Sequence, residues 1–221
     1  RLPAELFPGI PVVLGALTED EVPEKGFGSH VTGVVQRIDF PGALELILKL
    51  HPDTERIVVI GGTAALDPRY LRLTEEAGRS LAGRVDFDYW TTRAVAEMRQ
   101  AVASLTPRTV IFFTTVFRDA TGKTFLPASV ASMLAVQSSV PVYVVADSLI
   151  GGGTAGGLVA HLEALGMRLG ELAQQVLGGT APASLPIEVR KDGVPMFDWR
   201  ALQRWGIKES RLPPDSVVRF R

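Results

Sequence analysis

The sequence contains no cysteine, and neither sign of charge dominates it. Without a thiol, disulfide bonds, cysteine nucleophiles and cysteine-ligated metals are excluded. The formal net charge of −1 gives no electrostatic reason for contact with nucleic acid, and we expect no nucleic-acid partner. No run approaches the roughly 20 uncharged apolar residues of a membrane span. The composition therefore excludes several classes of protein before any motif is considered.

Motifs that carry catalysis are also scarce. The three histidines, His30, His51 and His161, are far apart in the sequence, and no GxSxG motif is present to anchor a serine nucleophile. Asp86 and Asp88 could form a pair of carboxylates, but two solvated residues of a strand explain them better. We therefore expect that this chain is not itself an enzyme and that it uses no metal and no cofactor.

What the chain does contain is a repeated alternation of apolar runs and amphipathic segments. Runs rich in β-branched residues are apolar on both faces, which indicates parallel strands buried between helices. We expect such strands at 11–17, 31–35, 57–63, 109–115 and 141–147, and an alternating strand nearer an edge at 85–90. Helices are expected after Asp39, over 68–83, over 95–105 and after Pro127. This order predicts an α/β fold in which helices flank a Rossmann-like parallel sheet.

The last third of the chain follows a different pattern. A glycine-rich turn over 151–157 is expected to lead directly into a long helix with a leucine stripe from Leu158 to Leu172, ended by Gly178. The segments 187–191 and 194–197 flank Asp192-Gly193, which predicts a β-hairpin. Asp198 is expected to cap a short helix that Gly206 terminates.

The glycines at 151–157 have two interpretations. They could form a phosphate-binding loop, but the Lys-Ser/Thr pair of a P-loop is missing, and the dinucleotide fingerprint does not fit either. The interpretation that we favour is that they allow backbone to pass close to backbone.

Small polar residues follow three of the expected parallel strands, and their carboxyl ends should meet at one edge of the sheet. Such a set would hold a small polar ligand through hydrogen bonds and one aromatic surface. For each residue alone, capping of a strand end is nearly as good an explanation. The candidate ligand-binding residues are Gly62, Thr63, Thr114, Thr115, Phe117, Asp147 and Ser148.

Five segments in order resemble one family. They are LFPGIPVVLGAL at 6–17, TGVVQRIDFPGALELILKLHPDTERIVVIGGTAALD at 32–67, FFTTVFRDATGKTFLP at 112–127, PVYVVADSLIGGGTAGG at 141–157 and MFDWRALQRWGIKESRLPPDSVVRFR at 196–221. Together they resemble periplasmic-binding-protein-like domains related to ABC-transporter substrate-binding proteins of the tryptophan/tyrosine-binding type. The versions that form extracytoplasmic sensor domains of bacterial histidine kinases are especially similar.

The resemblance implies a type I periplasmic-binding-protein-like fold of two Rossmann-like lobes with a ligand held between them and closure by hinge motion. It implies a remnant of lobe 1 at 1–31, lobe 2 at 32–150 and a return to lobe 1 at 151–221. Lobe 1 is then incomplete, so we expect a fragment of a longer protein.

The function that the resemblance implies is sensing of a small molecule by a two-component histidine kinase. The ligand would be an amino acid, a sugar or an aromatic metabolite, and kinase modules would follow in the same parent chain, which could form a homodimer. The domain would lie on the periplasmic side of the inner membrane that holds the parent protein. Two alternatives stay open: a solute-binding protein of an ABC importer, and a Rossmann-like enzyme that uses a nucleotide or a sugar phosphate.

Overall fold

The structure is a computed structural model that describes residues 9–23, 27–190 and 193–221. None of the helices in these ranges combines the length and the apolar character needed to cross a membrane. The strands form two sheets, and the described residues divide into two compact units. Unit 1 contains the described residues of Arg1–Ile38 and Ala160–Gly193, and unit 2 contains Asp39–Val159 and Val194–Arg221.

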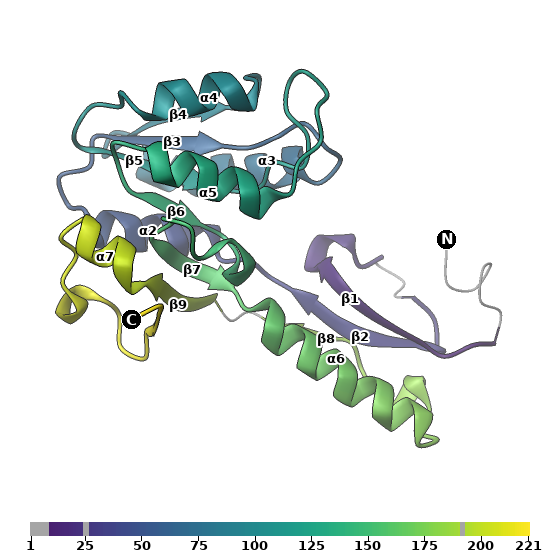
Figure 1. Ribbon diagram of the computed structural model, residues 1–221. Helices are drawn as coiled ribbons and strands as arrows, with labels where there is room; N and C mark the ends of the chain where they lie inside the picture. The colour runs from purple at the N-terminus through teal and green to yellow at the C-terminus, as the bar shows by residue number, and fades with distance from the viewer. Residues whose placement is uncertain (1–8, 24–26, 191–192) are drawn as a thin grey trace. The chain divides into compact units, whose positions relative to one another are not determined.

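Unit 1 is built on a three-stranded sheet of order β1-β2-β8, in which both strand pairs are parallel. The helix α6 packs on β1 and β2 (Figure 1). Leu165 and Leu172 of this helix are buried against Val34, as the predicted leucine stripe requires. The bounds are β1 Val12–Thr18, β2 Val31–Gln36, α6 Leu162–Leu177 and β8 Glu188–Arg190.

Unit 2 is built on a seven-stranded sheet of order β10-β9-β7-β6-β5-β3-β4. The bounds of its strands are β3 Arg56–Ile60, β4 Asp86–Trp90, β5 Thr109–Phe113, β6 Val142–Val144, β7 Gly156–Ala160, β9 Gly193–Asp198 and β10 Val217–Arg219. Those of its helices are α2 Phe40–Leu50, α3 Asp67–Gly78, α4 Val95–Val102, α5 Pro127–Gln137 and α7 Trp199–Arg204.

The central strands of unit 2 are covered on both faces. The helix α2 packs beside α3, and α4 packs beside α5 (Figure 1). Every residue of β5 is consequently buried, as are the last four of β3. A strand covered on both faces has no solvent-exposed face, so its sequence does not alternate between apolar and polar residues and forms a continuous apolar run. The predicted parallel α/β sheet is therefore confirmed, and β4, whose sequence alternates, lies at the edge of the sheet.

Several local predictions are also confirmed. Asp39 caps α2 by accepting a hydrogen bond from the backbone N of Gly42, and Pro41 occupies the first turn. Asp198 caps α7 by accepting from the backbone N of Arg200. These side-chain caps satisfy backbone donors that have no partner inside the helix.

Two predictions for the last third of the chain are wrong. The glycine-rich turn does not lead directly into a helix, because residues 156–160 form β7 and Leu158 lies on this strand. The expected hairpin does not form either. β8 pairs with β2 in one sheet, and β9 belongs to the other sheet. Asp192 of the expected hairpin turn lies outside the described residues.

The glycines of β7 are explained by close packing rather than by phosphate binding. A Cβ atom on Gly156 would lie 2.0 Å from the carbonyl oxygen of Met196 on β9, and its φ of +106° favours glycine. A side chain there would separate neighbouring strands of the sheet. The predicted close approach of two backbone segments is therefore found at this position.

The unit boundaries differ in place from the predicted lobe boundaries. The sequence places them after residues 31 and 150, whereas the contacts place them after residues 38, 159 and 193. The C-terminal segment with α7 packs with unit 2.

Candidate functional site

The candidate residues follow three adjacent parallel strands of unit 2. β3 pairs with β5 up to Ile60 and Phe113, and β5 pairs with β6 up to Phe113 and Val144. Because these strands run in one direction, the loops that follow them emerge at the same edge of the sheet (Figure 1). We call this the carboxyl edge, formed by residues 61–66, 114–126 and 145–150.

The loops after β3 and β5 are joined by backbone hydrogen bonds. The backbone N of Gly62 donates to the carbonyl of Thr115 (2.9 Å), and the backbone N of Thr63 donates to that of Arg118 (2.8 Å). The Thr63 hydroxyl donates to the carbonyl of Asp119 (2.9 Å), and the Arg118 guanidinium returns a bond to the carbonyl of Thr63 (2.9 Å). The two loops therefore behave as one structure.

Gly62 is required because the loops approach each other so closely. A Cβ atom at this position would lie 2.6 Å from the carbonyl oxygen of Arg118 and would also overlap the Asp67 carboxylate. Real Cβ atoms essentially never come so near, so any side chain would push the loops apart. The role found for Gly62 is thus to let the backbones pack.

A buried carboxylate fixes the loop after β3. Asp67, at the start of α3, is fully buried and accepts from the backbone N of Ala64 (2.8 Å). It also accepts a hydrogen bond from the hydroxyl of Thr115. The carboxylate thereby links the β3 loop, α3 and the β5 loop, because a buried charge is stable only with such partners.

Asp119 plays a similar role in the loop after β5. Its carboxylate accepts from the backbone N of Val95 (3.0 Å), from the backbone N and hydroxyl of Thr121 (2.9 and 2.6 Å), and from the backbone N of Lys123 (3.2 Å). Desolvation alone would raise the pKa of Asp119, but these hydrogen bonds outweigh it and hold the pKa below its usual value. The ionised side chain ties α4 to this loop.

The structure thus brings Gly62, Thr63, Thr115 and Phe117 into one loop assembly, but their polar groups are used internally. The Thr114 hydroxyl is also internal, since it is buried and donates to the carbonyl of Ile60 (3.0 Å). Phe117 differs because this residue is large, apolar and 39% exposed.

Asp147 and Ser148 lie in the turn after β6, at the same edge. Asp147 is buried and begins a short 3-10 turn, Asp147–Leu149, while Ser148 is exposed. Thr154 fixes this turn by donating to the carbonyls of Leu149 (2.9 Å) and Gly151 (3.1 Å). The sequence therefore predicts the position of both residues at the edge.

Sequence reasoning missed the two acids that hold the site together. Asp67 precedes Pro68 at the start of a helix, and acids at that position commonly satisfy backbone donors. Asp119 opens the turn Ala120-Thr121-Gly122, where an aspartate commonly bonds backbone two residues on. These turn signals could have identified both residues as organisers of the edge.

The arrangement can bind but offers little for catalysis. At the carboxyl edge no base is paired with a nucleophile among the residues discussed, and the hydroxyls of Thr63, Thr114 and Thr115 are engaged as donors to backbone or carboxylate. Within the described ranges, no three His, Asp or Glu residues are grouped as a metal site requires.

Comparison with solved structures gives similar α/β proteins. An ABC domain in complex with L-Trp from Streptococcus pneumoniae is 22% identical, with a TM-score of 0.67, and the match covers 91% of this chain and 69% of that one. The ligand-free, open structure of a substrate-binding protein with adhesive properties from Clostridium difficile is 19% identical, with a TM-score of 0.69 and coverage of 96% and 71%. At these identities the likeness shows the fold, which is type I periplasmic-binding-protein-like.

The family comparison is more direct. No curated protein matches the chain significantly. A family model described as ABC transporter substrate binding protein, by contrast, matches residues 8–212. Such proteins bind a small molecule rather than transform it, in agreement with the geometry of the carboxyl edge. The chain belongs to the ABC transporter substrate-binding protein family.

Proposed function

We propose that the protein binds a small polar organic molecule at the carboxyl edge of unit 2, as the substrate-binding component of an ABC importer. Phe117 packs against the body of the ligand, Asp147 anchors a polar group, and Ser148 donates a hydrogen bond. Thr63, Thr114 and Thr115 act indirectly, since their hydroxyls are bonded within the protein. They hold the loops that present the other residues.

The observation that carries this proposal is that the loops of the carboxyl edge are held together by hydrogen bonds within the protein itself. Gly62, Thr63 and Thr115 are bonded across the two loops, and the buried Asp67 and Asp119 fix the assembly from within. A site whose backbone is already ordered loses less conformational entropy when a ligand binds. An exposed aromatic ring on such a rigid loop is a suitable apolar contact for a small ligand.

The ligand class follows from the residue types at the edge. The carboxylate of Asp147, the exposed hydroxyl of Ser148 and the ring of Phe117 suit a molecule with a cationic or hydroxylated group and an apolar part. Amino acids, sugars and aromatic metabolites meet this description. Amino acids come first because the similar Streptococcus pneumoniae structure holds L-Trp.

The sensor domain of a histidine kinase is the second candidate, supported by the resemblance of the sequence to such domains. Both functions require binding on the extracytoplasmic side of the membrane, where proteins of this family act. They differ in what the parent gene encodes after Arg221, because a sensor continues into a membrane span and kinase modules. Reading that gene distinguishes an importer component from a kinase.

The binding step is tested by a thermal-shift screen followed by calorimetry. A ligand that binds the native state selectively raises the apparent stability, by about 2.7 kcal/mol at a concentration of 100 Kd. Phe117→Ala and Asp147→Ala should each weaken the binding of the ligand found by about tenfold. Val136→Ala on α5, an exposed apolar residue, is the matched control and should leave affinity unchanged.

Two results would contradict the proposal. If no amino acid, sugar or aromatic metabolite stabilises the protein, the ligand class is wrong. If a ligand is found but binds Phe117→Ala and Asp147→Ala as tightly as the native protein, the location at the carboxyl edge is wrong.

A further inference from the structure

A cavity of about 380 Å³ lies at the opposite, amino edge of the same sheet. Its lining comes from the end of α2, from the segments that lead into β3, β5 and β6, and from the C-terminal segment after α7. Figure 1 shows β3 and β5 starting at the left, where α7 also lies. The volume is in the range of about 300–1,000 Å³ that small-molecule sites occupy.

One wall of the cavity contains the ring of His51, which is held from behind by the buried Tyr143. The Nε2 atom of His51 lies 2.8 Å from the hydroxyl of Tyr143, which is fully buried, and the rings meet edge to face. Burial, and secondarily the charge of Arg211, lower the pKa of His51 to about 4. His51 is therefore neutral at pH 7, and its ring contributes contact surface to the cavity rather than a charge. Pro52 and Pro107 add apolar lining.

Two donors that line the cavity lack the partners that such groups normally have. The Nε1 atom of Trp205 is buried and has no hydrogen-bond partner among the described residues. A buried indole N–H without a partner is unfavourable, so it is usually satisfied by protein, water or a ligand. The position of this donor in the wall of a cavity suggests that a ligand acceptor completes it.

The second donor is the guanidinium of Arg211. It donates to the carbonyl of Lys49 (3.2 Å), and no carboxylate of the described chain forms an ion pair with it. Arg108, which also lines the cavity, is different: it pairs with Glu55 and donates to the carbonyl of Asp53 (2.7 Å). Arg211 therefore supplies a positive charge that no ion pair of the described chain neutralises, while the lining also contains one carboxylate, that of Asp53.

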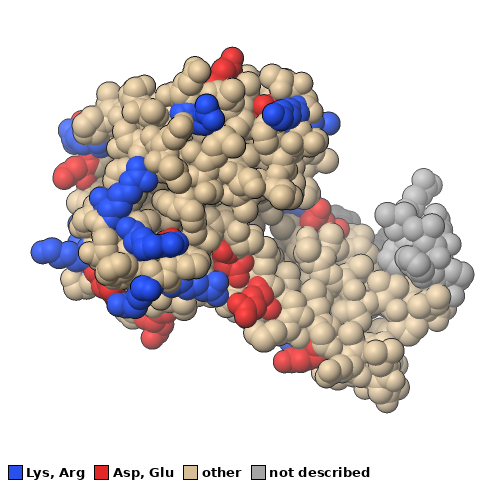
Figure 2. All heavy atoms as spheres, viewed as in Figure 1, with Lys and Arg blue, Asp and Glu red and all other residues tan. Residues whose placement is uncertain are grey.

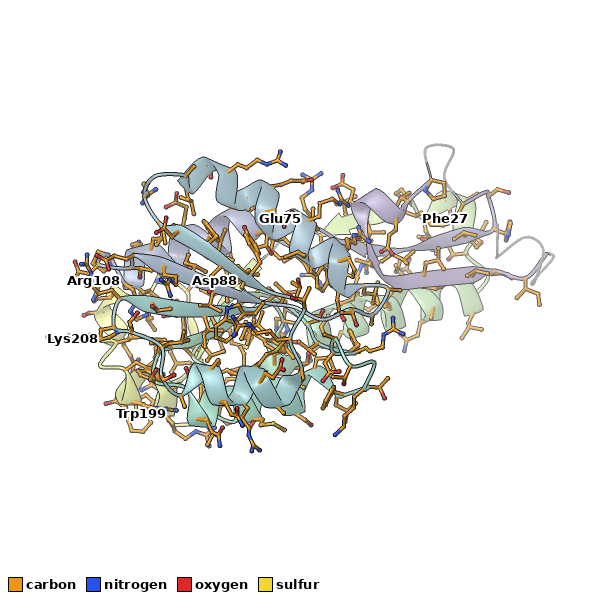
Figure 3. The ribbon with its side chains drawn as sticks, turned by 90° about the horizontal axis from the view of Figure 1, so that it is seen from above. Phe27, Glu75, Asp88, Arg108, Trp199 and Lys208 are labelled. Carbon is orange, nitrogen blue, oxygen red and sulfur yellow. The ribbon has the colours of Figure 1, made fainter. Side chains whose placement is uncertain are left out.

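The C-terminal segment that carries Arg211 has an excess of basic residues. Residues 199–221 contain six Lys or Arg and two Asp or Glu, a formal charge of +4 in a chain whose net charge is −1. Figure 2 shows basic side chains gathered on the left of the view, where Figure 1 places α7. Arg108 and Lys208 both lie at the left-hand end of the view in Figure 3. Such a field raises the local concentration of anions.

We propose that this cavity is a second binding site, which takes a small organic anion with a carboxylate on a flat apolar body. The carboxylate accepts hydrogen bonds from the Arg211 guanidinium and the Trp205 indole N–H. The body packs against His51 and Pro52. Hydrogen bonds between a guanidinium and a carboxylate are stronger than those between neutral groups, and the bond from the indole N–H fixes the orientation of the carboxylate. The site is independent of the carboxyl edge, so either can exist without the other.

The test is a titration of the full 221-residue chain, labelled with ¹⁵N, with sodium benzoate. The three tryptophans give three indole signals, and Trp205→Phe assigns that of Trp205. We expect benzoate to move this signal downfield in a saturable way and benzamide, which has no charge, to leave it in place. Phenyl phosphate tests whether a phosphate ester is accepted at the same donors.

Variants of exposed residues make the result specific. Arg211→Gln should weaken benzoate binding about tenfold or more, and Arg211→Lys should retain part of it. Lys208→Gln removes a nearby charge outside the lining and should change affinity less than threefold. Phe117→Ala should leave benzoate binding intact, which separates this site from the carboxyl edge.

The proposal is overturned by any of three outcomes. The first is that neither benzoate nor phenyl phosphate moves the Trp205 signal. The second is that benzamide moves this signal as much as benzoate does. The third is that the Arg211→Gln variant binds benzoate as tightly as the native protein. Because Arg211 is exposed, its substitution leaves the core intact, and an unchanged HSQC spectrum elsewhere checks the fold.

Discussion

Acidification should destabilise the protein through His51. Its Nε2 atom bonds to the hydroxyl of the buried Tyr143, and burial together with Arg211 lowers its pKa from 6.5 to about 4. The unfolded chain therefore binds a proton more readily than the folded chain between these values. The free energy of unfolding then falls as the pH falls from about 6.5 to 4, and it is unaffected by His51 above pH 7.

The size of the effect follows from the two pKa values. Each pKa unit corresponds to about 1.4 kcal/mol, so complete titration of His51 costs roughly 3 kcal/mol. At pH 5 the loss relative to pH 8 is about 2 kcal/mol. Against a typical total stability of about 5–15 kcal/mol, a loss of this size is readily measured.

Urea unfolding at pH 5, 6, 7 and 8 measures the effect, and His51→Gln isolates it from the titration of carboxylates. The native protein should lose about 2 kcal/mol more than His51→Gln between pH 8 and pH 5. Arg211→Gln should lose less than the native protein, since it removes one cause of the lowered pKa. Equal losses in the native protein and His51→Gln would refute the reasoning.

Four further substitutions test the packing of the loops and strands. Gly62→Ala should lower the free energy of unfolding by about 1–3 kcal/mol, because its Cβ overlaps the facing loop and the Asp67 carboxylate, and urea unfolding measures this. Gly166→Ala is the control: no atom lies within 4 Å of a Cβ placed at this position, and alanine, which favours helix over glycine, should stabilise α6 by about 0.5–1 kcal/mol. Asp119→Ala should cost roughly 2–4 kcal/mol and accelerate proteolysis of the loop after β5. Gly156→Ala should prevent normal pairing of β7, seen as lost amide-exchange protection of that strand; full protection would contradict its role.

The sheet of unit 2 could be predicted because burial itself shapes its sequence. The strands β3 and β5 are covered on both faces, so their residues are apolar without alternation. The edge strand β4 has a less covered face, and its sequence alternates accordingly. Capping residues such as Asp39 and Asp198 act within a few residues of themselves, and local sequence is enough to identify them.

The errors arise where distant contacts override local signals. The sequence Gly156-Gly157 favours a turn, yet β7 forms there because another strand passes close to its backbone. Asp192-Gly193 is a strong hairpin signal, but β8 gains more by pairing with β2, which is far away in the sequence. Neither the close approach nor the pairing can be read from neighbouring residues.

For the candidate site, too, the sequence predicts where the residues lie but not which partners their side chains contact. Topology predicts that Thr63, Thr115 and Ser148 emerge at one edge, and they do. Where each hydroxyl is directed depends on acceptors such as Asp67, which the sequence does not bring near. Since the threonine hydroxyls are engaged, they contribute to ligand binding by order rather than by contact. The choice of ligand must then depend mainly on the exposed Phe117 and Ser148, and we expect substitutions of these two to change specificity more than substitutions of the threonines.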